Sequence, residues 1–236
     1  MPRLASYVVA ALLAATPLLV SDANAQGNAT PNQPAQPQPA SAQATAETVA
    51  KVQAFYDGTT SFTSPFNQEF WVKSHNVRKK SKGKVTFAKP GKMAWDYEEP
   101  AGNRVVSDGT MLKVYEAANK QMFEQNIDKS QYPAALSFLT GTGKLSDSFT
   151  FVMYPGESMD FAGGSVLVGT PKKESSAYTK VLFYVDSSTS HIRRALIVDA
   201  QGNRNRFDFV EPKVNVQVDE STFKLVPPAG TQVIRP

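Results

Sequence analysis

Residues 84–97 read Lys84-Val-Thr-Phe-Ala-Lys-Pro-Gly-Lys-Met-Ala-Trp-Asp-Tyr97, and residues 105–115 read Val105-Val-Ser-Asp-Gly-Thr-Met-Leu-Lys-Val-Tyr115. Apolar and polar residues alternate along both stretches, which is the period of a β-strand. The alternation breaks at residues 89–92 and again at residues 98–103, where proline and glycine occur. The block therefore predicts consecutive antiparallel strands joined by tight turns.

The middle strand of this block carries large apolar side chains at every second position. Met93, Trp95 and Tyr97 share one face, while Lys92 and Asp96 point to the other. We therefore expect one face of this strand to be apolar and the opposite face to be polar.

The rest of the chain repeats this pattern between turn-rich segments. Further strands are predicted at residues 149–153, 181–185, 196–198, 207–209 and 214–218. Short amphipathic helices are expected at residues 47–56 and 133–139. A sheet of about ten antiparallel strands tends to curl. The predicted fold is mainly β with short helices, a curved antiparallel sheet forming a half-open barrel covered by a helical lid.

Several of these segments, in this order, resemble the periplasmic outer-membrane lipoprotein carrier family, LolA. The segments that carry the resemblance are the first strand at 62–68, the turn at 89–91, the strand Met93-Ala-Trp95, the turn at 106–109 that leads to Tyr115, and the ending at 223–233. The resemblance covers roughly residues 47 to 234. It implies a carrier that receives acylated lipoproteins at the inner membrane and hands them to the outer membrane.

Such a carrier needs an apolar cavity and a movable cover. Methionine and aromatic side chains suit an adaptable lining. The candidate cavity residues are Phe66, Phe87, Met93, Trp95, Tyr97, Phe149, Phe151 and Met153, and the candidate lid residues are Val52, Phe55, Leu136, Phe138 and Leu139. The residues alone do not distinguish a cavity from a filled barrel core.

The position before the proline of the strand-turn motif is Lys89. In proteobacterial members of the family, an arginine there bonds to the helical lid and helps to close it. Lysine carries a point charge without a planar fork, so Lys89 is the candidate lid-closing residue but with a different bonding geometry.

The resemblance also implies the partners. These are acylated lipoproteins, an inner-membrane lipoprotein-releasing ABC transporter and an outer-membrane acceptor, with the chain itself a monomer. A periplasmic lipid-sensing regulator of the same fold, a carrier of another lipid, and a secreted hydrolase are the alternatives.

The N-terminal region predicts export to the periplasm. Arg3 precedes an apolar run that ends near Val20, and Ala23-Asn24-Ala25 suits a signal peptidase, so residues 1–25 are the predicted signal peptide. An uncleaved tether is the alternative. Residues 26–45 are rich in proline, glutamine and alanine and predict a disordered leader, and residues 46–236 form one carrier domain.

Catalytic and metal chemistry finds little support in the sequence. The chain has no cysteine and only two histidines, His75 and His191, both in polar stretches where exposed loops are expected. This composition does not suit a catalytic triad or a zinc site. No glycine-rich phosphate loop links a strand to a helix. We therefore expect no enzyme activity, no metal, no cofactor and no nucleic-acid partner.

One dense run of positive charge occurs at residues 77–84, in a chain whose formal net charge is +4. The simplest interpretation is a solvated hairpin tip whose lysines protect an edge from pairing. The alternative is docking to an anionic membrane surface or an acidic partner. Scattered charges such as Lys84, Asp96 and Lys180 interrupt the apolar band that a transmembrane barrel requires.

Overall fold

The computed structural model describes residues 37–127, 140 and 143–235, which belong to one unit that starts at Pro37. The predicted signal peptide and most of the predicted leader lie outside the described residues. So does the predicted helix at 133–139, with the candidate lid residues Leu136, Phe138 and Leu139.

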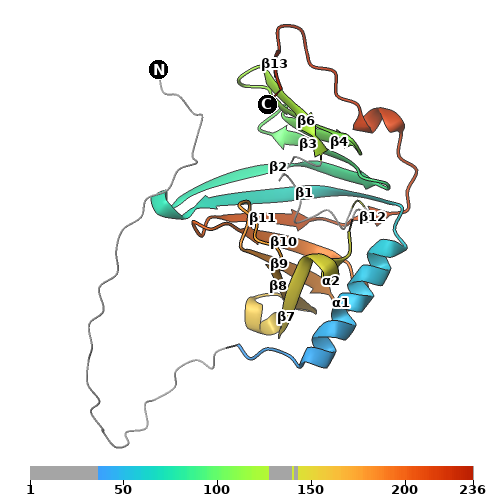
Figure 1. Cartoon of the computed structure of the whole chain (residues 1–236), viewed down its shortest axis with the longest axis vertical. Coiled ribbons are helices and arrows are strands. Elements are labelled where there is room, and N and C mark those ends of the chain that lie inside the picture. Colours follow the sequence, from blue (N-terminus) through green and yellow to red (C-terminus); the bar gives the residue numbers. More distant parts are fainter. Residues whose placement is uncertain (1–36, 128–139, 141–142, 236) are drawn as a thin grey trace, which may run out of the picture. The chain divides into compact units, whose positions relative to one another are not determined.

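One large curved sheet dominates the structure (Figure 1). Its thirteen strands are β1 (Ser61–Val72), β2 (Val77–Ala88), β3 (Lys92–Glu99), β4 (Arg104–Asp108), β5 (Met111–Glu116), β6 (Gln121–Asn126), β7 (Phe149–Pro155), β8 (Gly164–Pro171), β9 (Lys180–Asp186), β10 (Ile192–Val198), β11 (Arg204–Phe209), β12 (Lys213–Val214) and β13 (Gln232–Ile234). They follow the order β13-β6-β5-β4-β3-β2-β1-β11-β10-β9-β8-β7, with β12 paired to β1.

The sheet is unclosed, because β7 and β13 end the path and do not pair with each other. Its strand pairs are antiparallel except β13 with β6, which is parallel. The predicted half-open barrel is therefore confirmed, with more strands than the ten expected. One reason is that the alternating stretch at 105–115 contributes two strands, β4 and β5, joined by a turn in the region expected at 106–109.

The turns predicted around the central block are confirmed. β2 and β3 pair from Ala88 opposite Lys92, and β4 and β5 pair from Ser107 opposite Leu112. Gly91 and Gly109 both adopt positive φ in these turns, a conformation that glycine reaches without the penalty of a Cβ. The alternating sequence thus fixes the strand register through its turn residues.

Helix α1 (Ala42–Asp57) lies against the concave side of the sheet, and the short helix α2 (Leu145–Ser148) lies beside β7 (Figure 1). Val52 and Tyr56 of α1 are buried in the main core, together with inward side chains from β1, β2, β3 and β11. Residue spacing explains this contact, since Val49, Val52 and Tyr56 recur on one face of a helix.

The start of α1 corrects the sequence prediction. The helix begins at Ala42, not at Glu47, so residues 42–45 are helical and the predicted end of the disordered leader at 45 is wrong. Ser41 is the N-cap, and its Oγ accepts a hydrogen bond from the backbone N–H of Ala44 at 3.1 Å. Ser41 stands alone in a proline-rich and alanine-rich stretch, so the local sequence did not indicate that a helix starts there.

The outer face of β3 is also covered, which the alternation alone did not predict. A C-terminal segment with the 3-10 turn η5 (Glu220–Phe223) packs Phe223 and Leu225 against Ala94. Lys92 forms an ion pair with Glu220 at 2.7 Å, which fastens this segment to the sheet. The face predicted to be polar therefore contains a second, smaller apolar cluster.

Candidate functional site

Aromatic side chains fill the interior of the sheet at the β1–β3 side. The ring centroid of Trp95 lies 5.0 Å from Phe66, 5.7 Å from Phe87 and 5.0 Å from Phe207, and all four side chains are buried. Such distances are typical of packed aromatic pairs. Four of the candidate cavity residues, Phe66, Phe87, Met93 and Trp95, thus lie together in one closely packed core cluster.

Trp95 has an unusual polar feature within this cluster. Its indole Nε1 is buried and has no hydrogen-bond partner among the described residues. A buried donor without an acceptor costs about 1–3 kcal/mol. Nearby Tyr97 is half-buried, and its hydroxyl donates to Gln68 Oε1 at 3.0 Å. The interior is therefore almost wholly apolar at Trp95 and becomes polar toward Tyr97.

The remaining candidate cavity residues lie on β7, at the other end of the sheet. Phe149 and Met153 are buried and Phe151 is half-buried, on the face of β7 that joins the main core. The Phe183 ring lies 5.9 Å from Phe149 and 6.3 Å from Phe151. This strand is the edge of the sheet and packs against α1.

A groove of about 620 Å³ separates one side of α1 from β7. Its size falls within the range of ordinary ligand pockets. The lining consists of Ala42, Thr45, Ala46, Val49, Ala50, Gln53, Ala54 and Asp57 of α1, with Ser146, Phe149, Thr150, Phe151 and Lys172 opposite. Val49, Phe149 and Phe151 also contact the main core, so the groove borders the apolar interior.

The alanine side of this groove was not predicted from the sequence. Ala42, Ala46, Ala50 and Ala54 recur every four residues and lie along one face of α1. Their small side chains leave space that larger residues would fill. The four-residue repeat was visible in the sequence, but the predicted helix started after its first two members.

Lys89 holds the C-terminal end of α1. Its Nζ donates to the backbone carbonyls of Tyr56 at 2.6 Å and Asp57 at 3.1 Å. A cation at the C-terminus of a helix also opposes the negative end of the helix dipole. The candidate lid-closing residue therefore lies at the lid, although it binds main-chain oxygens as a point charge.

Other polar contacts also connect α1 and its flanking residues to the described part of the chain. Tyr56 is buried, and its hydroxyl accepts a hydrogen bond from the backbone N–H of Ile192 at 3.0 Å. Burial raises the pKa of the Tyr56 hydroxyl, so it stays protonated. Gln53 Oε1 accepts from the N–H of Leu145 at 2.8 Å, and the N–H of Ala40 donates to Met153 O at 2.8 Å.

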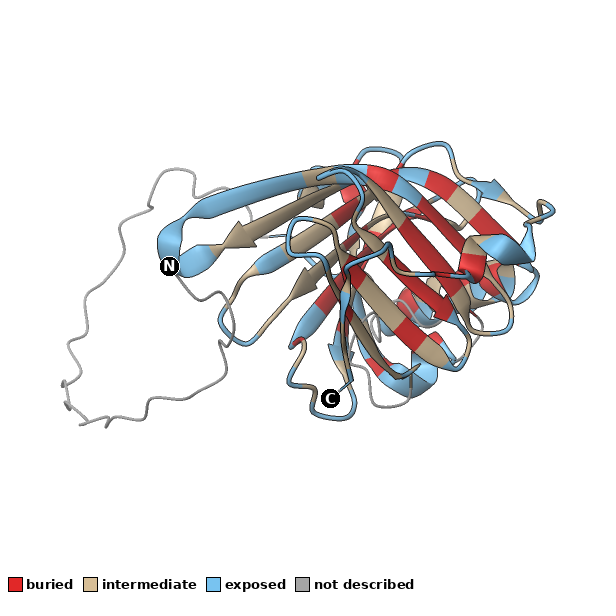
Figure 2. Cartoon of the chain, turned by 90° about the horizontal axis from the view of Figure 1, so that it is seen from above, coloured by how far each residue is buried: buried red, intermediate tan, exposed pale blue. Residues whose placement is uncertain are grey.

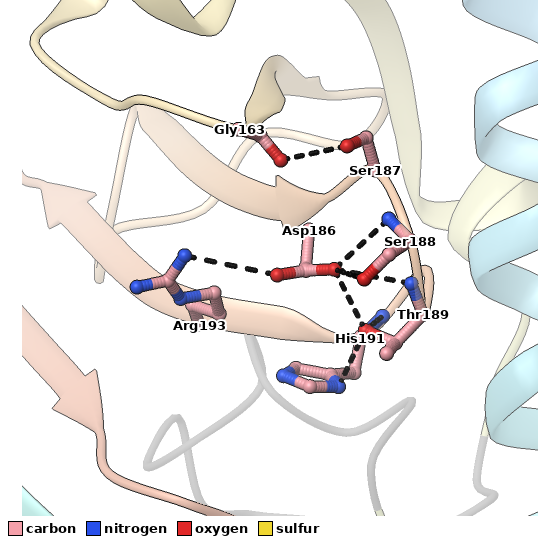
Figure 3. A network of polar contacts seen from close by, with 7 residues as sticks. All are labelled: Gly163, Asp186, Ser187, Ser188, Thr189, His191 and Arg193. Atoms are coloured by element: carbon pink, nitrogen blue, oxygen red, sulfur yellow. Dashed lines mark hydrogen bonds and ion pairs between the residues drawn. The ribbon is translucent and has the colours of Figure 1, made fainter.

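The β9–β10 turn holds a network of polar contacts around Asp186 (Figure 3), and its His191 lies beside Phe55 near the C-terminal end of α1. One carboxylate oxygen of Asp186 accepts hydrogen bonds from the hydroxyls and backbone N–H groups of Ser188 and Thr189. These bonds, led by that from the Ser188 hydroxyl, lower the pKa of Asp186 to about 2. Thr189 Oγ1 lies 2.7 Å from His191 Nδ1, which orients the imidazole.

His191 differs from the exposed loop residue that the sequence predicted. Its ring is half-buried, 5.9 Å from the ring of the candidate lid residue Phe55. Burial lowers the pKa of His191, which favours the neutral imidazole against the apolar helix. His191 therefore has a packing contact with α1, while His75 is exposed as expected.

Replacing Lys89 by methionine is expected to loosen α1. The change removes two charge-assisted hydrogen bonds, so the opening free energy of the last turn of α1 should fall by about 1–2 kcal/mol. Amide hydrogen exchange of residues 52–58 measures this loss. Lys92→Met, which breaks the ion pair with Glu220, is the matched control. Equal protection of α1 in wild type and Lys89→Met would show that Lys89 does not hold the helix.

The sequence profile of the family described as "Outer membrane lipoprotein carrier protein LolA" matches residues 57–226. The chain belongs to the LolA family. The match begins at the last residue of α1 and includes the whole sheet except β13.

Relatives named "Outer-membrane lipoprotein carrier protein" agree with this family membership. The one from Chromobacterium violaceum is 27% identical over 92% of this chain and 96% of its own length. The one from Ralstonia nicotianae is 28% identical over 83% of this chain and 90% of its own length.

Solved structures of similar fold show lower sequence identity to this chain than these relatives do. A LolA superfamily protein from Nitrosomonas europaea is 13% identical, with a TM-score of 0.42 over 76% of this chain and 97% of that chain. A conserved protein from Thermus thermophilus is also 13% identical, with a TM-score of 0.49 over 82% of this chain and 100% of that chain.

The described residues offer neither a metal site nor a membrane-spanning helix. No cluster of three or more histidine, aspartate or glutamate side chains in 37–127, 140 and 143–235 could share a metal ion. None of the helices in these ranges is long and apolar enough to cross a bilayer.

Proposed function

We propose that this LolA-family chain carries acylated lipoproteins through the periplasm, and that acyl chains enter between α1 and β7. The observation that supports this most directly is the groove of about 620 Å³, in which Phe149 is part of the apolar core and Val49 and Phe151 pack against that core. An acyl chain in this groove would extend the core and leave water.

The free energy of exposing acyl chains to water explains why they need an apolar site. Burying one methylene is worth about 0.8 kcal/mol, so lipid chains with some forty methylenes in total favour an apolar environment by about 30 kcal/mol. Free diffusion of the lipoprotein through water is therefore negligible. A carrier has to cover the chains and still release them, which favours a site that opens by moving one element.

Helix α1 is the element suited to move. It packs on the sheet mainly through Val52, Tyr56 and Phe55, and polar bonds at its ends hold it in place. Outward movement of α1 would widen the groove and give access to the aromatic cluster around Trp95. The aromatic and methionine side chains there can repack around an irregular ligand.

This mechanism involves binding and release without a chemical step. The proposed partners are an inner-membrane ABC transporter that releases lipoproteins and an outer-membrane acceptor, and the proposed working form is a monomer. Lys89 would act as the closing contact, since its bonds to Tyr56 O and Asp57 O exist only while the end of α1 stays near the β2–β3 turn.

Native mass spectrometry of the protein isolated from the periplasm tests the proposal. The expected result is a complex of one chain with one acylated lipoprotein. A complex with a protein that carries no acyl chain would contradict it and favour a regulator. Depleting the protein in cells is a second test. Lipoproteins are then expected to accumulate at the inner membrane.

A further inference from the structure

The hairpin of β1 and β2 extends beyond the packed interior. Both strands have twelve residues and pair continuously from Ser61 opposite Ala88 to Val72 opposite Val77. Inward side chains up to Phe66 are buried in the core, whereas every residue from Lys73 to Lys80 is exposed. Figure 2 shows this exposed end, closed by η1 (Lys73–His75), reaching past the other strands.

Positive charge concentrates at this end. We define the hairpin end as residues 69–80 with Arg204, which pairs with Trp71 from β11. It contains Lys73, Arg78, Lys79, Lys80 and Arg204 against a single carboxylate, Glu69. Its formal net charge of +4 equals that of the whole chain, so the rest of the chain is neutral in sum.

Aromatic side chains accompany these cations. The Arg78 guanidinium lies 5.4 Å from the centre of the Trp71 ring, and that of Arg204 lies 5.1 Å from it. Trp71 Nε1 donates to Asn76 Oδ1 at 3.0 Å, which fixes the ring beside the turn. Phe70 points to the opposite face because side chains alternate along a strand. The half-buried Trp71 thus shares its face with Arg78, Lys80 and Arg204, and the half-buried Phe70 shares the opposite face with Lys79.

We propose that the hairpin end binds the surface of an anionic lipid bilayer. Tryptophan is favoured at the membrane interface, and each lysine or arginine near an anionic surface strengthens binding. The cations occupy both faces and the turn, as in Lys73, Arg78 and Lys79. An end-on contact with a diffuse plane of headgroups engages all of them, whereas an acidic protein surface would contact one face.

Vesicle binding by the full chain tests this inference independently of cargo binding. Wild type is expected to bind phosphatidylcholine vesicles that contain phosphatidylglycerol, to bind pure phosphatidylcholine far more weakly, and to dissociate with added salt. The variant K73Q/K79Q/K80Q should bind anionic vesicles about a hundredfold more weakly, at about fivefold per lysine.

The matched control is K173Q/K180Q/K224Q, which removes three exposed lysines outside the hairpin. None of the six lysines forms an ion pair among the described residues. The control should bind anionic vesicles within about threefold of wild type, since the hairpin charges remain. An equal loss in both variants would mean that only net charge matters and would overturn the inference.

A depth measurement adds a second readout. Lipids brominated near the headgroup should quench Trp71 fluorescence in wild type, and this quenching should disappear in Trp71→Phe. Unchanged quenching in Trp71→Phe would contradict contact by the hairpin end. Binding to an acidic protein with no binding to anionic vesicles would also overturn the proposal.

Discussion

Ala50→Trp is expected to weaken binding of a triacylated lipopeptide at least about tenfold. The indole would occupy the groove between α1 and β7, in which Ala50 lines one wall. Excluding two methylenes from the groove costs about 1.6 kcal/mol, which corresponds to roughly this factor. Isothermal titration with the lipopeptide in detergent-free buffer measures the change.

Lys51→Trp is the matched control for this prediction. Lys51 neighbours Ala50 on α1, is also exposed, and does not line the groove. Both substitutions should change the free energy of unfolding by less than about 0.5 kcal/mol, because both sites are at the surface. Equal affinities of the two variants for the lipopeptide would mean that acyl chains do not use this groove.

Trp95→Ala should be strongly destabilising, by about 3–5 kcal/mol, because it opens a void among Phe66, Phe87 and Phe207. Trp95→Phe should lower the free energy of unfolding by less than about 1 kcal/mol. It also reduces the packed volume, but it removes the buried Nε1–H that has no acceptor among the described residues. Urea unfolding followed by circular dichroism gives both values.

The informative quantity is the difference between the unfolding free energies of Trp95→Phe and Trp95→Ala. If Trp95→Phe destabilised as much as Trp95→Ala, the indole N–H would have a favourable partner and the interior would be more polar than described. A small loss in both would mean that the aromatic cluster is loosely packed.

The sequence was a good guide to the sheet because its signals are local. Alternation in 84–97 and 105–115, with glycine at 91 and 109, specifies strands, turns and register without knowledge of distant residues. The apolar face of β3 followed from the same period of two. These features depend on near neighbours in the chain, so one sequence was enough.

Packing between residues far apart in the chain could not be predicted from the sequence in the same way. Ala94 belongs to the face predicted to be polar, yet it is buried under Phe223 and Leu225, more than a hundred residues later in the chain. The groove arises where alanines of α1 meet an edge strand, and neither element alone indicates a gap. The choice between a packed interior and a cavity also depended on side-chain distances, which showed a filled cluster around Trp95.

Lys89 was predicted only in part: its position followed from the resemblance, but its bonding partners did not. The resemblance to the carrier family indicated its position, and the loss of the arginine fork was expected to change the closure. Its acceptors are two main-chain carbonyls at the end of α1, which a single ammonium group can bind together. Main-chain acceptors leave no mark in a sequence, so this contact required the structure.

Photo-crosslinking with a lipopeptide whose acyl chain bears a diazirine tests the central claim most directly. Mass spectrometry of the labelled chain should place the adducts on α1 and β7, at positions such as Val49, Phe149 and Phe151, with few on the outer face of the sheet. Adducts confined to the outer face, or an even distribution over the surface, would contradict entry of acyl chains between α1 and the sheet.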